Sequence, residues 1–297
     1  MINQRPPRVL ITGKNGQVGR ELTERAAELA IDFVAFDSKE LDIRDRSAVL
    51  AAVVRHQPTA VINPAAYTAV DKAEEEVGLA YAVNRDGVEN LALACKAQDV
   101  PLIHISTDYV FDGEKDSPYV ESDTPNPTGV YGASKYAGEE ILRVTWHKHV
   151  IVRVSWVFGR YGNNFVKTML RLAQERDELG VVDDQFGAPT SASSIASVLI
   201  DLAFRTDDVS VDIESGRLLH LESGPGVTWC GFARSIFSEA RKLSVITKSV
   251  QVNPISSDQF PTPITRPKNS KLSSEVGLIP VQWWKEGLDS VLREIGR

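Results

Sequence analysis

The chain of 297 residues has few of the residues that build disulfide frameworks or protein-made metal sites. Its two cysteines, Cys95 and Cys230, lie far apart in segments with helical patterns, so we expect both to be buried free thiols. Its five histidines form no closely spaced cluster of the kind that binds zinc. The sequence therefore argues against a disulfide-stapled fold and against a zinc enzyme.

Long apolar runs and an excess of positive charge are missing as well. No apolar stretch reaches the roughly eighteen residues of a membrane span, and residues 1–7 lack the apolar core of a signal peptide, so we expect a cytoplasmic protein. The 40 acidic residues outnumber the 33 basic ones, which gives a net charge of −7. This charge argues against nucleic acid and against a membrane surface as partners, and leaves small molecules as the expected ligands.

Short runs rich in valine, isoleucine and leucine alternate with helical patterns through the first half of the chain. This order predicts an α/β fold with a Rossmann-like, doubly wound parallel sheet that is covered by helices on both faces. Ligands of such sheets bind at the carboxyl ends of the strands. We expect strands at 8–12, 32–37, 60–63, 101–106 and 149–155, and helices from about 20, at 46–56, from about 70 to 98, and at 131–144.

The first expected strand ends in a glycine-rich turn, Gly13-Lys-Asn-Gly16-Gln-Val-Gly19, and a helical pattern follows. Strand, turn and helix in this order are the context of a dinucleotide-binding fingerprint. The glycines let the backbone approach a pyrophosphate, and the helix N-terminus supplies free N–H groups. The second glycine comes three residues after the first instead of two, which departs from the usual spacing, so a plain tight turn stays the alternative.

Asp37 ends the second expected strand about 20 residues past the glycines, where an acid can hold the adenosine ribose hydroxyls of a cofactor. Taken alone, this carboxylate favours NADH over NADPH, although Lys14 and Arg44 could offset that preference. The alternative is that Asp37 only caps a turn after the strand. Asp42 and Ile43 follow shortly afterwards and could hold the edge and face of an adenine.

The segment from Ser106 to Lys135 carries the side chains best suited to chemistry. Tyr131 and Lys135 are four residues apart, so on a helix they share a face. A cation beside a phenol of pKa ~10 favours the phenolate and moves the group toward the working range of a general acid. Thr107 ends the preceding strand, where its hydroxyl could hold the same substrate oxygen. Ordinary packing at a strand end and a helix start is the alternative.

Three other polar side chains near this segment receive structural interpretations. His104 lies inside an expected strand, and we expect it to be a histidine of the core or of the sheet face. Glu139 and Glu140 are expected to point outward from the helix that carries Tyr131. The loop 108–127 is long for a connection of this kind, and such loops often cover a site.

The second half of the chain is more irregular. Residues 217–221 are expected to return to the sheet as its last strand, which makes a smaller α/β substrate domain discontinuous. We therefore expect a dinucleotide-binding domain at 1–157 plus about 191–222, and a substrate domain at about 158–190 plus 223–297. The proline-rich basic segment 261–270 suits a diphosphate or is a surface loop. Further helices are expected from 163 or 164 to 174 and at 193–204, 228–243 and 281–295, a strand and loop at 181–190, and a strand at 249–255.

The glycine turn, Asp37, Thr107 and the pair Tyr131-x-x-x-Lys135 together resemble the extended short-chain dehydrogenase/reductases. More narrowly, the chain resembles the dTDP-4-dehydrorhamnose reductase family, on motifs that run nearly from end to end and are specific as a set. Pro64 is a departure, because the family usually has a small residue there. The matching segments are 13–19, 67–74, 106–111, 130–135, 155–158, 162–165, 184–190 and 266–270.

The resemblance implies a reduction of the C4 keto group of dTDP-4-dehydro-L-rhamnose to dTDP-L-rhamnose by NADH or NADPH. It assigns Tyr131 as proton donor, Lys135 as the group that lowers the pKa of the phenol and holds the nicotinamide ribose, and Thr107 as the group that positions the oxygen. It also implies a homodimer, and magnesium in some members, for which no residue can be named here. The cofactor contacts that it implies are Gly13, Asn15, Gly16, Gln17, Val18, Gly19, Asp37, Asp42, Ile43, Ala66, Tyr67, Thr68, Tyr131 and Lys135, and the sugar contacts are Thr107, Asp108 and Trp156.

Two other functions stay open at this point. A nucleotide-sugar dehydratase or epimerase of the same superfamily shares the fold, but by resemblance the dehydratases carry Asp-Glu directly after the threonine, and here Asp108 is followed by Tyr109. A non-catalytic, reductase-like regulatory subunit is the other alternative. The intact Thr107, Tyr131 and Lys135 speak against it.

Overall fold

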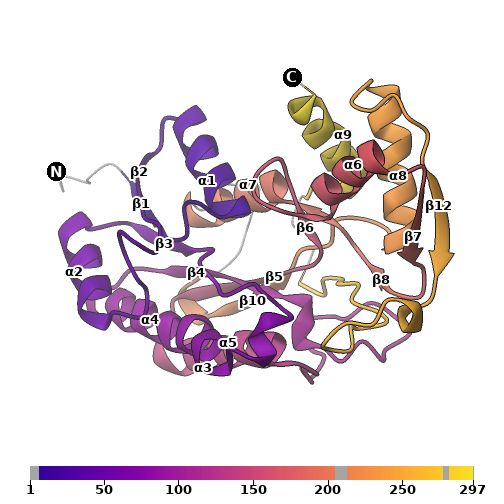
Figure 1. Cartoon of the computed structure of the whole chain (residues 1–297). Helices are drawn as coiled ribbons and strands as arrows, with labels where there is room; N and C mark the ends of the chain where they lie inside the picture. Colours follow the sequence, from indigo (N-terminus) through magenta and orange to yellow (C-terminus); the bar gives the residue numbers. More distant parts are fainter. Residues whose placement is uncertain (1–6, 205–212, 277–280, 297) are drawn as a thin grey trace.

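A six-stranded parallel sheet forms the centre of the protein (Figure 1). The structure, a computed structural model, describes residues 7–204, 213–276 and 281–296. The strands run in the order β10-β5-β4-β3-β1-β2, and every neighbouring pair is parallel, which confirms the predicted fold class. The strands are β1 (Arg8–Ile11), β2 (Asp32–Ala35), β3 (Ala60–Asn63), β4 (Leu102–Thr107), β5 (His149–Val154) and β10 (Arg217–His220).

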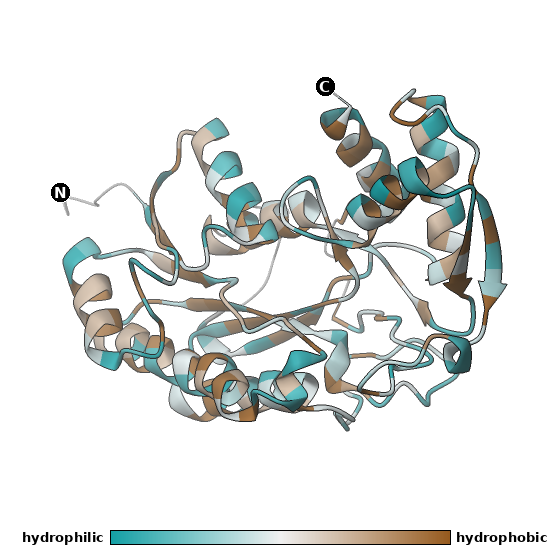
Figure 2. Ribbon diagram, in the orientation of Figure 1, coloured by the Kyte–Doolittle hydropathy of each residue, from teal (hydrophilic) through white to brown (hydrophobic). Residues whose placement is uncertain are grey.

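Helices cover both faces of this sheet because successive strand residues point to opposite sides. In β1, Val9 and Ile11 pack with α1 (Gln17–Glu28) and α7 (Ala192–Phe204), whereas Leu10 between them packs on the other face. That other face is covered by α2 (Arg46–His56), α4 (Gly87–Gln98) and α5 (Val130–Thr145). Figure 2 shows the apolar strands between helices whose outer surfaces are hydrophilic.

The expected helix between about 70 and 98 is divided in the structure. A 3-10 turn (Lys72–Glu74) comes first, and α3 (Val77–Tyr81) then continues through a π-helical turn (Ala82–Asp86) into α4. Turns of this kind often occur at functional sites. This one carries the buried Asn84, whose side chain bonds the backbone of Tyr67 at both N and O.

The second half of the chain forms a separate apolar core. It is built from α6 (Phe165–Glu175), α8 (Trp229–Lys242), α9 (Trp284–Ile295) and the parallel pair β7 (Glu178–Val182) and β12 (Gln251–Ile255). The expected strand and loop at 181–190 begin with the end of β7, and the loop is interrupted by β8 (Phe186–Gly187) and ends at β9 (Thr190–Ser191). These short strands pair with neighbours, β8 with β11 (Val227–Thr228) and β9 with β6 (Val157–Phe158).

Several sequence predictions can be checked directly. Strand β10 does return to the sheet beside β5, and Cys95 and Cys230 are both buried free thiols, as predicted. Within the described residues, no helix has the length and apolar character needed to cross a membrane. The signal-peptide prediction rests on residues 1–7, of which 1–6 lie outside the described residues.

The prediction for Glu139 is wrong. Its side chain is fully buried, and its carboxylate forms an ion pair with the equally buried Arg153 of β5, at 2.6 Å between Oε2 and Nη2. The Ser106 hydroxyl donates to the same carboxylate at 2.5 Å. Glu139 lies four residues after Lys135 and eight after Tyr131, so the three side chains share one helix face, and that face is directed at the sheet. Glu140 is exposed, as expected.

Replacement of Arg153 by methionine should lower the free energy of unfolding by about 3–5 kcal/mol, because it leaves the Glu139 carboxylate buried and unpaired. The double variant Arg153→Met, Glu139→Met should recover much of that loss. Chemical denaturation measures both. The control is Arg171→Met, which breaks the exposed pair with Glu175 on α6 and should cost at most about 1 kcal/mol. Equal losses in Arg153→Met and Arg171→Met would contradict the role given to the buried pair.

Candidate active site

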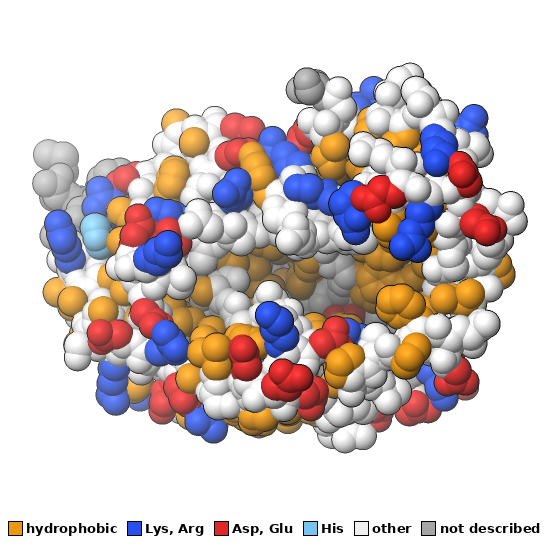
Figure 3. Space-filling model, viewed as in Figure 1, with side chains coloured by type: hydrophobic (Ala, Val, Ile, Leu, Met, Phe, Trp, Pro, Cys, Tyr) orange, Lys and Arg blue, Asp and Glu red, His pale blue; other side chains and the backbone are white. Residues whose placement is uncertain are grey.

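The expected site residues gather where the sheet reverses its strand order. Strands β2 and β3 lie on opposite sides of β1, so the carboxyl ends of β1 and β3 flank a topological switch point, where such folds bind ligands. Figure 3 shows the face of the molecule hollowed at its centre, with apolar side chains inside and charged side chains around the rim. The glycine turn follows β1, the segment 64–68 follows β3, and Thr107 ends β4.

The glycine turn has the geometry that a pyrophosphate requires. Gly13 has a positive φ of 59°, and a side chain there would come within 2.9 Å of the backbone of Ala65. A Cβ on Gly19 would lie 2.1 Å from the Gly13 carbonyl oxygen. Gly16 is the N-cap of α1 and offers no side chain to the helix, so the first N–H groups of α1 stay available to a ligand. These features fit a dinucleotide cofactor better than a plain turn.

Asp37 both caps a turn and faces the glycine loop. Its Oδ1 accepts from the backbone N–H groups of Lys39 and Glu40, while Oδ2 accepts from Asn15 Nδ2 at 2.9 Å. These hydrogen bonds, first that from Lys39, hold the pKa of Asp37 below its usual range. Asp37 can therefore cap the turn and still bind the ribose hydroxyls of a cofactor.

The cations that were expected to offset Asp37 are already paired with carboxylates. Lys14 Nζ lies 2.5 Å from Glu40, and Arg44 forms a two-pronged contact with Asp42, at 2.6 Å for its closest approach. Each of these two cations is therefore held by another carboxylate of the same segment, and Lys39 lies exposed two residues after Asp37. To bind Lys14 or Arg44, a phosphate on the cofactor ribose would have to displace one of these pairs.

The other expected cofactor residues differ in how accessible they are. Ala66 and Tyr67 are half-buried and Thr68 is exposed in the segment after β3, with the Tyr67 hydroxyl donating to Glu76 at 2.7 Å. Gln17 accepts from Asn164 Nδ2 at 2.9 Å, which links α1 to the second half of the chain. Val18 and Ile43 are buried, Val18 in the core cluster on one face of the sheet and Ile43 in that on the other.

Tyr131 and Thr107 lie together at the carboxyl end of β4. Thr107 is buried, its hydroxyl donates to Asp108 Oδ1 at 3.0 Å and accepts from the backbone N–H of Tyr109 at 3.2 Å, and it acts to lower the pKa of the Tyr131 phenol. The ring of Tyr109 stands edge-on to Tyr131, with 5.5 Å between centroids. Burial raises the pKa of Tyr131, and Thr107 acts against that rise.

Lys135 makes its direct polar contacts with residues of β4. Its Nζ donates to the Ile105 carbonyl oxygen at 2.6 Å and lies 3.3 Å from His104 Nε2, and both partners belong to the central strand β4. The pKa of Tyr131 is raised rather than lowered, and Lys135 is not among the groups that act on it here. Burial lowers the pKa of Lys135 itself to about 8, with Glu139 acting in the opposite direction. The hydrogen-bond contacts of Lys135 are those with Ile105 and His104, and the pairing of its ammonium group with the phenol stays a prediction.

Asp108 is a buried carboxyl group in the centre of the site. Its Oδ1 accepts from Thr107 at 3.0 Å and its Oδ2 from Ser155 at 3.0 Å, and Ser270 makes a third hydrogen bond. Burial nevertheless raises the pKa of Asp108 to about 6. The sequence analysis missed Ser155 and Ser270, although each lies within a motif that it quoted.

Trp156 occupies a strained position at the end of β5. Its φ is 47°, which is rare for a bulky residue and a frequent mark of functional sites. The ring is stacked on Trp229 at 3.4 Å, and Nε1 donates to Ser270 at 3.1 Å. A Cβ on Gly187 would lie 2.2 Å from the Trp156 ring, so glycine is needed there.

The proline-rich basic segment reaches this site through Arg266. The Arg266 guanidinium lies 2.6 Å from Asp71 and 3.2 Å from the Tyr109 hydroxyl. The segment therefore does face the hollow, but its arginine is already paired. A diphosphate bound there would compete with Asp71.

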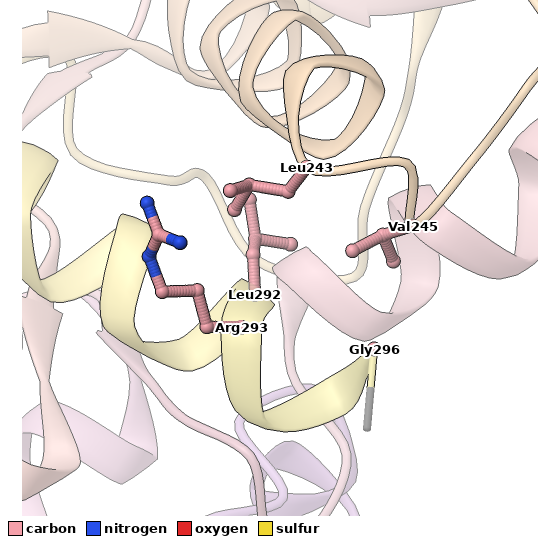
Figure 4. A pocket seen from close by; sticks show the side chains of 5 residues that line it. All are labelled: Leu243, Val245, Leu292, Arg293 and Gly296. Carbon is pink, nitrogen blue, oxygen red and sulfur yellow. The ribbon is translucent and has the colours of Figure 1, made fainter.

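Metal binding finds no support in the described residues. Among them, no three His, Cys, Asp or Glu side chains come together in a way that could hold a metal ion, so no step is assigned to magnesium. A small pocket of about 240 Å³ lies elsewhere, at the ends of α8 and α9 (Figure 4). It is lined by Leu243, Val245, Leu292, Arg293 and Gly296 and contains none of the residues discussed above.

The fold and the site define a protein of the short-chain dehydrogenase/reductase class, with a glycine turn at the switch point and Thr107, Tyr131 and Lys135 at the next strand end. Comparison with known proteins narrows this class. The family model described as "RmlD substrate binding domain" matches residues 7–297. The chain belongs to the dTDP-4-dehydrorhamnose reductase family.

Curated relatives and solved structures agree with this assignment. The dTDP-4-dehydrorhamnose reductase of Aggregatibacter actinomycetemcomitans is 45% identical over 93% of this chain and 95% of its own length. That of Escherichia coli is 40% identical over 97% of both chains. The Bacillus anthracis reductase, solved in complex with NADP, has a TM-score of 0.89 and 39% identity and covers 98% of this chain and 100% of its own. A Thermus thermophilus UDP-glucose 4-epimerase, with a TM-score of 0.77 and 22% identity over 97% of this chain and 98% of its own, shares the fold.

The raised pKa of Asp108 predicts a pH-dependent effect on stability. A carboxyl group with a raised pKa stabilises the fold below its unfolded pKa of about 4, and that contribution is lost as the pH rises through about 6. Asp108→Asn should therefore gain on the order of 2–3 kcal/mol of unfolding free energy relative to the wild type between about pH 4 and about pH 8.

Denaturant unfolding at a series of pH values measures this difference. Asp112→Asn is the matched control with the opposite sign, because a hydrogen bond from Tyr119 lowers the pKa of Asp112 and its contribution is lost on acidification. The same direction of change in both variants would refute the assignment for Asp108.

Proposed function

We propose that this protein catalyses the reduction of the C4 keto group of dTDP-4-dehydro-L-rhamnose to dTDP-L-rhamnose with NADH or NADPH. The observation that carries the proposal is the placing of Tyr131 with Thr107, which acts to lower the pKa of the phenol, at the carboxyl end of a sheet strand in a chain of this family. Reduction of a ketone requires hydrogen-bond donors that hold the carbonyl oxygen while negative charge develops on it, and two hydroxyl groups can serve as these donors.

The chain's own residues supply the proton and its setting. When bound, the reduced nicotinamide supplies a hydride. Tyr131 donates its phenolic proton to the oxygen as negative charge develops there, and Thr107 holds that oxygen in place. Lys135 in its ammonium form stabilises the phenolate that remains, and it contacts the nicotinamide ribose. Asp108 and Trp156 contact the sugar.

The cofactor fits the residues that the structure presents. The glycine turn and the N-terminus of α1 receive the pyrophosphate, and Asp37 receives the ribose hydroxyls, helped by Asn15. Because Lys14 and Arg44 are already paired with carboxylates while Asp37 faces the glycine turn, we propose a preference for NADH. We also propose a cytoplasmic, homodimeric enzyme, as expected from the sequence.

The two apolar cores support the proposed division into domains. The sheet with its helices would form the dinucleotide-binding domain at 1–157 plus about 191–222. The core of α6, α8 and α9 would form the substrate domain at about 158–190 plus 223–297. Limited proteolysis with and without cofactor tests the division.

Replacement of Tyr131 by phenylalanine removes the proposed proton donor and preserves the ring. We expect turnover to fall about 10²-fold or more, with cofactor binding retained. The assay follows loss of the reduced nicotinamide absorbance with enzymatically generated dTDP-4-dehydro-L-rhamnose. Tyr136→Phe, on the same helix, is the control and should keep its turnover. Nearly unchanged turnover in Tyr131→Phe would remove the phenol from the mechanism.

Asp37→Ala tests the cofactor assignment. Loss of this carboxylate removes its contact with the ribose and its repulsion of a phosphate, so the preference should shift toward NADPH. The ratio of kcat/KM for the two cofactors measures the shift. Asp32→Ala, at the other end of β2, is the control, since Asp32 pairs with Arg8 away from the glycine turn. An unaltered ratio in Asp37→Ala would place the ribose contact elsewhere.

A further inference from the structure

A chain of buried polar side chains connects the glycine turn to Lys135. Thr12, directly before Gly13, donates its hydroxyl to Asn63 Oδ1 at 2.6 Å. Asn63 Nδ2 lies 3.0 Å from His104 Nδ1, and His104 Nε2 lies 3.3 Å from Lys135 Nζ. All four side chains are at most 2% exposed, so each contact is made without competition from water. The four residues come from β1, β3, β4 and α5 or their ends.

The donor and acceptor in each of these side-chain contacts can be assigned, starting from Asn63. Asn63 Oδ1 accepts both the Thr12 hydroxyl and the backbone N–H of Ala65, and a backbone N–H can only donate. The remaining amide group of Asn63, Nδ2, must therefore donate to His104 Nδ1. A ring that accepts at Nδ1 carries its proton on Nε2 when it is neutral. The network thus fixes both the tautomer and the orientation of His104.

The consequence falls on Lys135. The Nε2–H group of His104 points at Nζ, and a neutral amine accepts such a hydrogen bond whereas an ammonium group offers only hydrogens. The amine can still donate to the Ile105 carbonyl, at 2.6 Å. A doubly protonated His104 is disfavoured as well, because its Nδ1–H would meet the Asn63 amide.

We propose that His104 is a positioning residue for Lys135, whose Nε2–H group holds the amine nitrogen in place and opposes its ammonium form. This inference rests on the proposed function for the use that Lys135 serves, but its geometry does not. His104 touches neither substrate nor cofactor. It acts through the lysine.

The other charged groups around this pair act in known directions. Burial, and then the charge of Lys135, lower the pKa of His104, whereas the Asn63 backbone raises it, and His149 on β5 lowers it further. Burial lowers the pKa of Lys135 to about 8, while Glu139 on α5 raises it. Glu139 is itself neutralised by Arg153. The field of Glu139 therefore does not outweigh burial, and His104 is the polar side chain in direct contact with Nζ.

Two substitutions separate positioning from simple filling of the core. His104→Asn keeps an amide near the position of Nδ1, where it can still bond Asn63, but its side chain is too short to reach Lys135. His104→Gln places its amide near the position of Nε2 and keeps the contact with Lys135. His149→Gln is the matched control, because His149 is another buried strand histidine whose ring bonds only the Trp146 carbonyl among the described contacts.

The deciding measurement is an NMR titration of the Lys135 amine in ¹⁵N-lysine-labelled protein, assigned with Lys135→Met. In His104→Asn the loss of the opposing N–H group should favour the ammonium form, so the titration should move upward by about one pH unit. His104→Gln should move less, and His149→Gln should match the wild type. An unshifted titration in folded His104→Asn would overturn the proposal, as would an equal shift in His149→Gln.

A kinetic measurement on the same variants separates this inference from the proposed function. With dTDP-4-dehydro-L-rhamnose and NADH, kcat/KM of His104→Asn should fall about 10-fold near neutral pH, because the ammonium group, although more populated, is displaced from the position where it stabilises the phenolate. Partial rescue by His104→Gln supports positioning, and equal losses in both variants oppose it. If the wild type does not turn over this substrate, the proposed function fails, and the titration still decides the role of His104.

Discussion

The buried ion pair between Glu139 and Arg153 sets the position of everything on the inner face of α5. Because the pair joins the helix to β5 in the interior, a rotation of α5 by a single residue would leave two charges unpaired away from water, at a cost of several kcal/mol. Tyr131 and Lys135 lie two turns and one turn before Glu139 on the same face. The ion pair therefore fixes the rotation of α5 about its axis. Ser106 and Arg143 donate further hydrogen bonds to the Glu139 carboxylate.

The irregular half of the chain completes a site whose framework is the sheet. Ser270 bonds both Asp108 and Trp156, so one residue of the segment 261–270 joins the ends of β4 and β5. Arg266 reaches the Tyr109 hydroxyl, and the Tyr109 ring stands against Tyr131. A ligand that moves this segment would thus alter the surroundings of the tyrosine through a short series of direct contacts.

The sequence predicted the regular half well because its signals are local. The bounds of α2 and β3 were predicted to the residue, and the strands around them to within two, since strand runs and helical periodicity are properties of neighbouring residues. The strands β8 and β9 have two residues each, which is too short for an alternating pattern, so the sequence could not predict them. The spacing of Tyr131, Lys135 and Glu139 places all three on one helix face and so indicates that Glu139 points inward. We predicted an outward position because charged side chains are mostly exposed. The contacts of His104 depend on Asn63, 41 residues earlier, and no local pattern reveals such a partner.

Burial acts on the three central ionisable groups in the same sense, toward their neutral forms. It raises the pKa of Asp108 to about 6, raises the pKa of Tyr131, and lowers that of Lys135 to about 8. A site with so little fixed charge and low polarity makes each remaining hydrogen bond strong. In the proposed reaction, Lys135, whose direct contacts are with His104 and Ile105, acts on the phenolate rather than on the ketone oxygen. Proton donation from Tyr131 is then the effective way to neutralise the negative charge that develops on that oxygen, and Thr107, which acts to lower the pKa of the phenol, favours that donation.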